Sequence, residues 1–221
     1  MDVKAVIFDL DGVLVSTDEF HYLAWKELAD EIGIPFDRNI NERLRGVSRM
    51  ESLEIILEKS SLNYTRQEKE MMADKKNERY RILLNNLSAD DILPGVISFI
   101  NTLYKNNINI AIGSSSKNAP LILEKTSLNT LFEVVVDGNH ITRSKPDPEV
   151  FLKAAQQLEV KPENCLVVED ADAGVEAAVR AGMRVLAVGL AACNPKAHFS
   201  ANNLVESSRL FNKNWIENKS R

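Results

Sequence analysis

The chain has 221 residues, of which 44% are hydrophobic, and its formal net charge is -5 at pH 7. This length and composition predict a folded chain with a substantial core and exclude an intrinsically disordered protein. The 27 Lys and Arg residues are spread along the chain, so we expect no nucleic-acid partner. No stretch approaches the roughly 20 apolar residues of a membrane span and no cleavable signal pattern is present, so we expect a cytoplasmic protein without a membrane partner.

The first predicted element is a buried strand over residues 3–10, which ends in the letters FDLDG at residues 8–12. In an extended segment, residues i and i+2 point to the same side, so Asp9 and Asp11 present both carboxylates toward one pocket. Ligands bind at the carboxyl ends of strands in open α/β sheets, so this position favours chemistry. The alternative is that Asp11 and Gly12 form a hairpin turn, although a helix start follows them and not a partner strand.

The next segment, residues 17–89, contains no strand candidate and shows apolar residues at helical spacings. Three S/T-x-x-E capping boxes mark predicted helix starts, because the hydroxyl and the carboxylate satisfy free backbone N–H groups there. We therefore expect a helical cap domain at 17–89, inserted into a core domain formed by residues 1–16 and 90–221. The three boxes begin at Ser16, Ser48 and Thr65.

Short apolar runs alternate with helix-like segments in the rest of the chain. Runs without polar alternation are typical of strands in a parallel sheet that is buried on both faces. The sequence therefore predicts a doubly wound, Rossmann-like α/β core with an inserted all-helical cap. The predicted strands after the cap are residues 108–113, 132–137, 165–169 and 184–189, followed by a last short strand and helix within 204–216.

Four further polar residues lie at or between the ends of these strands. Ser114 follows the run 108–113, Glu169 and Asp170 close the run that starts at Cys165, and Lys145 precedes a proline between two strands. Each has a plain structural alternative. Ser114 could be a helix N-cap, Lys145 an exposed loop lysine, and the acidic pair polar residues that simply end a strand.

Taken together, these motifs resemble the haloacid dehalogenase-like phosphotransferase superfamily, whose first motif is DxDGx(V/T), and the likeness spans nearly the whole chain. The resemblance implies that Asp9 attacks phosphorus and becomes an aspartyl-phosphate, while Asp11 is the general acid and base. It assigns Ser114 and Lys145 to the phosphoryl group that is transferred. The implied cofactor is Mg²⁺, held by Asp9, the backbone carbonyl of Asp11, Asp170 and, directly or through a hydrogen bond, Glu169.

Within the superfamily, the chain looks most like the sugar phosphomutases, which hold a second phosphate on a small sugar while the first is transferred. This demand calls for a second anion site, where Arg49 could bind phosphate bidentately beside the helix start that Ser48 caps. The alternative is a solvated arginine, although the helix dipole disfavours one in a first turn. The resemblance also assigns substrate contacts to Gly46, Val47, Ser48, Ser115, Ser116, Lys117 and Asn118, although a polar loop opening a helix would look similar.

Three more cap residues are assigned to the substrate by the same resemblance. Lys76 is similar to a cap lysine that contacts substrate, although a solvated helix face would also carry a lysine. His21 and Trp25 lie four residues apart and hence on one helix face near the hinge. The histidine would couple substrate binding to the general acid, although a lone helical histidine is often only solvated. Ser16 and Ser115 depart from the Asp and Ala that such mutases carry more often.

Other functions remain open at this point. A phosphatase of small phosphorylated metabolites would share every core residue, and only the cap distinguishes it from a mutase. A receiver-type signalling domain is also phosphorylated on an aspartate, but it needs no helical insert; a binding module with an inert site is a third alternative. We expect a monomer whose partner is a small sugar phosphate, and whose cap closes about residues 16–17 and 88–91 to exclude water.

Overall fold

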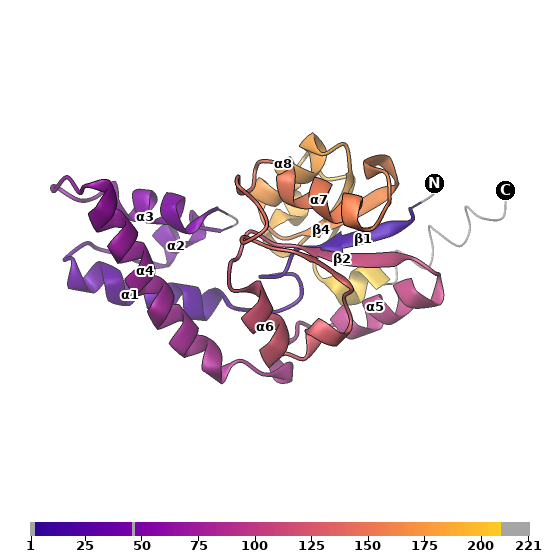
Figure 1. Ribbon diagram of the computed structural model, residues 1–221, viewed down its shortest axis with the longest axis horizontal. Coiled ribbons are helices and arrows are strands. Elements are labelled where there is room, and N and C mark those ends of the chain that lie inside the picture. Colours follow the sequence, from indigo (N-terminus) through magenta and orange to yellow (C-terminus); the bar gives the residue numbers. More distant parts are fainter. Residues whose placement is uncertain (1–2, 46, 209–221) are drawn as a thin grey trace.

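The computed structural model describes residues 3–45 and 47–208, which form two lobes in Figure 1. One lobe is built around a sheet, and within the described residues this sheet has six strands in the order β3-β2-β1-β4-β5-β6. All neighbouring strands pair in parallel, as expected of a doubly wound core. The strands are β1 (Ala5–Phe8), β2 (Asn109–Gly113), β3 (Val134–Val136), β4 (Cys165–Glu169), β5 (Arg184–Val188) and β6 (Phe199–Ala201).

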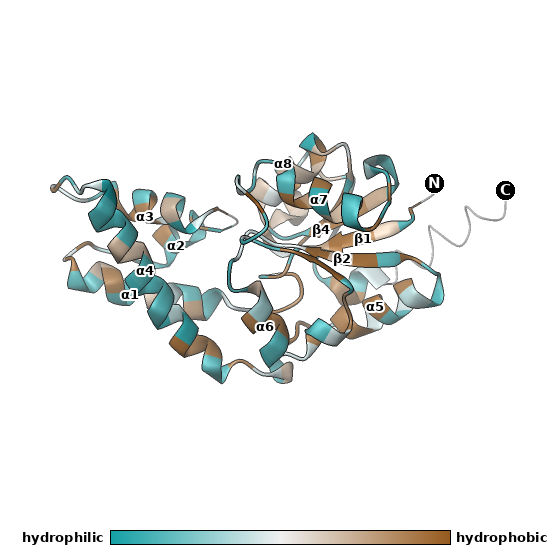
Figure 2. Ribbon diagram, in the orientation of Figure 1, coloured by the Kyte–Doolittle hydropathy of each residue, from teal (hydrophilic) through white to brown (hydrophobic). Residues whose placement is uncertain are grey.

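Helices cover both faces of the sheet, as Figure 1 shows. Alternate residues of a strand point to opposite faces and belong to two separate hydrophobic cores. In β1, Val6 and Phe8 pack in one core, whereas Ala5 and Ile7 pack in the other. Since both faces are buried, the strands are mostly apolar (Figure 2), and polar residues such as Asn109 and Glu169 lie at strand ends. The predicted fold class is confirmed. The covering helices are α5 (Val96–Lys105) and α6 (Ala119–Lys125) on one face, and α7 (Glu149–Gln157) and α8 (Asp172–Arg180) on the other.

The second lobe is inserted between β1 and β2, and its described residues form helices joined by loops, without a strand. Its helices enclose a hydrophobic cluster of their own, which includes Trp25, Leu53 and Ile56. Its helices are α1 (Asp18–Glu31), α2 (Arg38–Glu42), α3 (Arg49–Leu57) and α4 (Arg66–Leu83). Short 3-10 helices follow α4, namely η1 (Leu84–Asn86) and η2 (Ala89–Asp91). Three more lie in the lobe that contains the sheet: η3 (Leu128–Thr130), η4 (Pro162–Asn164) and η5 (Gly189–Cys193).

Two of the three predicted capping boxes are present, at the starts of α3 and α4. The box predicted at Ser16 is wrong. The N-cap of α1 is Thr17, whose side chain makes no bond to the helix. It is fully buried, and its hydroxyl donates to the carboxylate of Asp11. The Thr17 hydroxyl therefore donates to a buried carboxylate, and its oxygen does not accept a backbone N–H of the helix.

The end of the chain also differs from the prediction. The last strand described is β6, which lies before the predicted segment 204–216 and pairs with β5 at the sheet edge. Residues 204–208 are helical, and the rest of that segment lies outside the described residues. A three-residue edge strand is too short to give a clear apolar run. No helix in the described part of the chain has the length and apolarity needed to cross a membrane.

Candidate active site

The acidic residues of the sequence motifs meet at the carboxyl ends of β1 and β4. Phe8 pairs with Val168, and the N–H of Asp9 donates to the Val168 carbonyl at 3.0 Å. This register brings Asp9, Glu169 and Asp170 together, with one carboxylate oxygen of each within 4.8 Å of the others. The chain order of the strands reverses between β1 and β4, which is where doubly wound sheets bind ligands.

Lys145 reaches these carboxylates from the loop between β3 and α7. Its Nζ atom contacts both Asp9 and Glu169, and the side chain is 2% exposed, which excludes an exposed loop lysine. Burial opposes the charge on Lys145, but the two carboxylates outweigh burial and raise its pKa. Burial raises the pKa of Asp9 to about 8, against the attraction of Lys145. One ammonium group thus stands between two carboxylates and can neutralise only one of them.

Asp11 lies where the chain leaves the sheet for the cap. Burial raises its pKa to about 6, against the hydrogen bond from Thr17. A carboxyl group with a pKa near neutrality can give and take a proton at physiological pH. Gly12 follows with φ of +88°, and a Cβ there would lie 2.1 Å from Asp170 Oδ2. This glycine therefore permits a close approach of the backbone to the acidic cluster, and the chain continues into α1, not into a hairpin.

The start of α8 fixes the acidic pair at the end of β4. One oxygen of Glu169 accepts the N–H groups of Asp170 at 3.0 Å and Ala171 at 3.1 Å. A Cβ on Gly174 would lie 1.9 Å from the Glu169 carboxylate, so only glycine allows α8 to pack this closely. Burial, and then the charges of Glu169 and Asp9, raise the pKa of Asp170 well above its ordinary value. A divalent cation would relieve this repulsion.

A serine-rich turn follows β2 on the same side of the sheet. The hydroxyl of Ser114 is buried and accepts the N–H of Ser116 at 3.1 Å. Ser115 Oγ accepts the N–H of Lys145 at 3.4 Å, so this turn touches the loop that carries the lysine. The alternative role of Ser114 as a helix cap is wrong, because Asn118 is the N-cap of α6.

The end of this turn is held by the cap. Asn118 is buried, its side-chain NH₂ donates to Asn77 Oδ1 at 2.8 Å, and its Oδ1 accepts from Arg81 at 3.2 Å. Both partners lie on α4. Lys117 is exposed beside it at the cavity. Sequence reasoning placed Asn118 among the substrate contacts but gave no sign of its two cap partners.

Lys76 lies inside the cap among aromatic rings. It is 3% exposed, which excludes a solvated helix face. Its Nζ atom is 2.9 Å from His21 Nδ1 and lies 4.6 Å from the ring centre of Trp25 and 4.7 Å from that of Tyr80. Burial and then the charge of Arg49 hold the pKa of Lys76 well below its ordinary value. Burial also holds the pKa of His21 well below its usual range.

Two cap arginines face the core. Arg49 is half-buried and lies 3.7 Å from Asp74, and burial lowers its pKa. Arg45 pairs with Asp18 and lies 3.5 Å from Asp170, so it links the cap to the acidic cluster of the core. Sequence reasoning missed Arg45, since an arginine before a glycine in a polar stretch carries no distinguishing signal.

A single cavity of 810 Å³ brings these groups together, within the range of about 300–1,000 Å³ common for ligand sites. Within the described residues, every predicted site residue lines it, including Val47 and Ser48 of the cap. Gly46, which was also predicted, lies outside the described residues. The two lobes that supply the lining face each other in Figure 1.

Comparison with known proteins shows a similarity that covers both lobes of the chain. Residues 6–188 match the family model described as haloacid dehalogenase-like hydrolase. The chain is 47% identical to a β-phosphoglucomutase of Bacillus subtilis, covering 85% of this chain and 84% of that protein. It is 33% identical to a phosphorylated carbohydrates phosphatase of Thermotoga maritima, covering 82% of each. A crystal structure of β-phosphoglucomutase from Clostridium difficile has a TM-score of 0.89 and 38% identity, covering 99% of this chain and 100% of that one.

Proposed function

Because the chain belongs to the haloacid dehalogenase-like hydrolase family, we propose that it is a β-phosphoglucomutase, a phosphomutase of carbohydrate metabolism. It interconverts β-D-glucose 1-phosphate and glucose 6-phosphate through an aspartyl-phosphate and β-glucose 1,6-bisphosphate. The observation that carries this conclusion is the 47% identity to a β-phosphoglucomutase over 85% of the chain. The cavity supports it, because cap cations and the core carboxylates line the same cavity.

Asp9 is the proposed nucleophile, and Asp11 the proposed general acid and base. Phosphorylated Asp9 gives its phosphoryl group to the sugar hydroxyl, while Asp11 takes the hydroxyl proton. The bisphosphate then turns around in the cavity. Asp9 attacks the other phosphorus, and Asp11 returns the proton to the departing sugar oxygen. The pKa of about 6 for Asp11 suits both directions of this proton transfer.

Lys145 and Ser114 would stabilise the phosphoryl group during its transfer. The ammonium of Lys145 already contacts Asp9, so it reduces the repulsion between the carboxylate and an approaching phosphate. Ser114 is buried at the neighbouring strand end and lines the same cavity. Positioning and charge neutralisation of this kind account for most of the catalysis of phosphoryl transfer.

The acidic cluster fits a magnesium ion, since its donors are all oxygens gathered within 4.8 Å of one another. Asp9, Asp170 and the backbone carbonyl of Asp11 would hold it. Glu169 would orient these ligands, because one of its oxygens contacts Lys145 and the other accepts two backbone N–H groups. When bound, Mg²⁺ supplies positive charge that neutralises phosphoryl oxygens.

The second phosphate would lie against the cap and the end of the serine-rich turn. Arg49 and Lys76 line the cavity from the cap, and Ser116 and Lys117 line it from the core. Burial lowers the pKa of both Arg49 and Lys76, so an anion that displaces water there would be favoured. A phosphatase needs only one phosphate site, whereas a mutase needs both.

Closure of the cap would exclude water from the aspartyl-phosphate. We propose the cap as residues 17–89 and the core as 1–16 and 90–221. The two connections run side by side, since Val15 bridges Ile92 and the N–H of Ser16 lies 3.4 Å from the Asp91 carbonyl. A paired hinge of this kind suits a rigid-body closure. We also propose that the protein is a monomer that works in the cytoplasm on small sugar phosphates.

The test of this function is a paired assay with β-glucose 1-phosphate, a trace of its 1,6-bisphosphate and Mg²⁺. Isomerisation and release of inorganic phosphate are measured together. We expect isomerisation to dominate. Release of phosphate that dominates with every sugar phosphate tried would refute the mutase function.

Arg49→Ala sharpens the test. Loss of a bidentate phosphate contact should reduce isomerisation by about 100-fold while simple ester cleavage changes less than about threefold. Arg66→Ala is the matched control, because Arg66 is an exposed arginine at the start of α4 that pairs only with Glu70 among the described residues. Equal losses of both activities in Arg49→Ala would contradict the second phosphate site.

The second candidate is a phosphatase of small sugar phosphates. It is favoured by the 33% identity to a phosphorylated carbohydrates phosphatase. The core groups named above would serve hydrolysis equally well, with water in place of the sugar hydroxyl as acceptor. The same paired assay distinguishes the two functions. A signalling receiver domain is not favoured, because such a domain needs no helical insert.

A further inference from the structure

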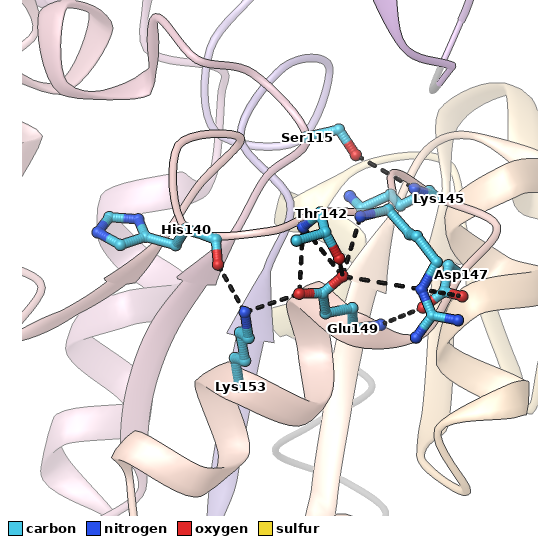
Figure 3. A network of polar contacts seen from close by, with 8 residues as sticks. Ser115, His140, Thr142, Lys145, Asp147, Glu149 and Lys153 are labelled. Carbon is cyan, nitrogen blue, oxygen red and sulfur yellow. Dashed lines mark hydrogen bonds and ion pairs between the residues drawn. The ribbon is translucent and has the colours of Figure 1, made fainter.

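The loop between β3 and α7 is braced around Glu149, the first residue of α7 (Figure 3). Its side chain is 12% exposed. One carboxylate oxygen accepts the N–H of Arg143 at 2.9 Å, together with the N–H of Thr142 at 3.1 Å and its hydroxyl at 2.9 Å. The other oxygen accepts from Lys153 Nζ at 2.7 Å. The carboxylate thus collects four donors, three of them from the loop.

Neighbouring contacts extend the brace in both directions. Lys153 also donates to the carbonyl of His140 at 2.7 Å, so it ties the beginning of the loop to the second turn of α7. Asp147 accepts the N–H of Glu149 at 3.0 Å and pairs with Arg143 at 3.2 Å. Figure 3 shows Thr142 and Lys153 at the Glu149 carboxylate, with the His140 carbonyl at Lys153 and Asp147 beside Glu149.

Lys145 lies inside this braced segment, between Arg143 and Asp147. Its own N–H has a long contact of 3.4 Å to Ser115 Oγ, whereas its Nζ must reach the buried carboxylate of Asp9. We propose that Glu149 is a positioning residue that holds the loop so that Lys145 meets Asp9 and the phosphoryl group. This inference rests on the proposed function, because it takes Asp9 as the nucleophile.

The charge of Glu149 is part of this role. The ammonium of Lys153, the N–H of Arg143 and the groups of Thr142 together lower its pKa to about 2. The carboxylate is therefore ionised throughout the working pH range, and its hydrogen bonds to the loop backbone are charge-assisted and strong. An amide at the same position would keep the shape but lose the charge, and its NH₂ group would face N–H donors.

The test is the steady-state kinetics of Glu149→Gln and Glu149→Asp. A displacement of Lys145 by about 1 Å should lower kcat on the order of 10- to 100-fold in Glu149→Gln. The KM should change less than about threefold, because the cap cations that would hold the second phosphate do not touch this loop. Glu149→Asp keeps the charged acceptor and should recover part of the lost kcat. Glu54→Gln is the control, because Glu54 pairs with Lys69 on the cap surface.

Circular dichroism and thermal melting show whether each variant is folded at the assay temperature. In Glu149→Gln, a kcat within threefold of the parent or a KM that rises as much as kcat falls would overturn the proposal. Equal losses of kcat in Glu149→Gln and Glu149→Asp would also overturn it. If Glu149→Gln does not fold, Lys153→Met replaces it. That variant removes one brace and should lower kcat about threefold, and an unchanged kcat would again overturn the proposal.

Failure of the proposed function is recognised separately. If the parent enzyme releases phosphate and does not isomerise, the mutase function fails. The comparison of Glu149 variants is then made on the rate of phosphate release, because Lys145 faces Asp9 in either reaction.

Discussion

The core and the cap treat their buried charges in opposite ways. In the core, Lys145 contacts the carboxylates of Asp9 and Glu169, and one of these accepts further backbone N–H groups. In the cap, Lys76 is equally buried, but its contacts are the rings of Trp25, Tyr80 and His21. Among the described residues, no carboxylate lies within ion-pair distance of Lys76.

This difference assigns two roles: the buried charges of the core fix the positions of reacting groups, and the buried lysine of the cap contributes to substrate binding. Buried opposite charges with hydrogen bonds fix atoms in place, which suits the groups that meet the reacting phosphorus. A buried cation without an anion is costly in the free protein, and a phosphate that arrives there compensates the cost. The core is therefore organised for the chemical step, and the cap holds a buried lysine, Lys76, for which a substrate phosphate would supply the anionic partner.

The largest effect that tests this comparison is expected for Lys145→Met. Removal of the ammonium leaves two carboxylates buried together, and the free energy of unfolding should fall by about 3–5 kcal/mol. Urea unfolding at pH 7 with a chelator present measures it. Lys69→Met is the control, since its surface pair with Glu54 should contribute less than about 1 kcal/mol. A loss no larger than that of the control would show that the core pair is not the fixed element described here.

Lys76→Met should change the free energy of unfolding in the opposite direction to Lys145→Met. An apolar side chain of similar length removes an unpaired buried charge, so the free energy of unfolding should rise by about 1–2 kcal/mol while isomerisation falls. Lys75→Met is a matched control on the same helix, because Lys75 is exposed and pairs with Glu31. If Lys76→Met destabilises the protein as Lys145→Met does, the contrast between cap and core is wrong.

The smallest effect is a pH dependence at the boundary between the lobes, at Asp11. Its pKa of about 6 exceeds that of an unfolded aspartate, so the folded state keeps this proton longer. Its contribution to stability is therefore present at low pH and is lost as the pH rises to about 6. Asp11→Asn, which keeps an oxygen for Thr17, should raise the free energy of unfolding by about 1 kcal/mol at pH 8 and leave it unchanged at pH 4.

Unfolding curves of the parent and Asp11→Asn at both pH values, without Mg²⁺, measure this difference. Asp30→Asn serves as the control, because Asp30 is an exposed carboxylate of α1 that pairs with Lys26. A gain that is equal at pH 4 and pH 8 would mean that Asp11 is not held protonated by burial.

The strand ends were accessible to sequence reasoning because their signal is local. A polar residue directly after an apolar run marks the end of a buried strand, and this rule located Asp9, Ser114 and Glu169. The capping boxes at Ser48 and Thr65 are local for the same reason and are confirmed. The strand β6 is too short to produce such a signal.

Contacts between distant segments had no such signal. The predicted capping box placed the first cap helix start at Ser16, yet the N-cap is Thr17, whose hydroxyl donates to Asp11. Asn118 is held by Asn77 and Arg81, which lie about 40 residues earlier in the chain. Buried polar groups form hydrogen bonds with the groups that lie near them, and the tertiary fold determines which groups these are.

The sequence by itself determined the doubly wound core, the helical insert and the identity of the groups that meet at the strand ends, because apolar periodicity and strand-end polarity are read over a few residues. Only the tertiary structure decided the charge environment of Lys145 and Lys76. Both are lysines in polar stretches, yet one is buried between carboxylates and the other among rings. Desolvation and Coulomb energies depend on neighbours in space, and the folded chain supplies those neighbours from segments far apart in the sequence.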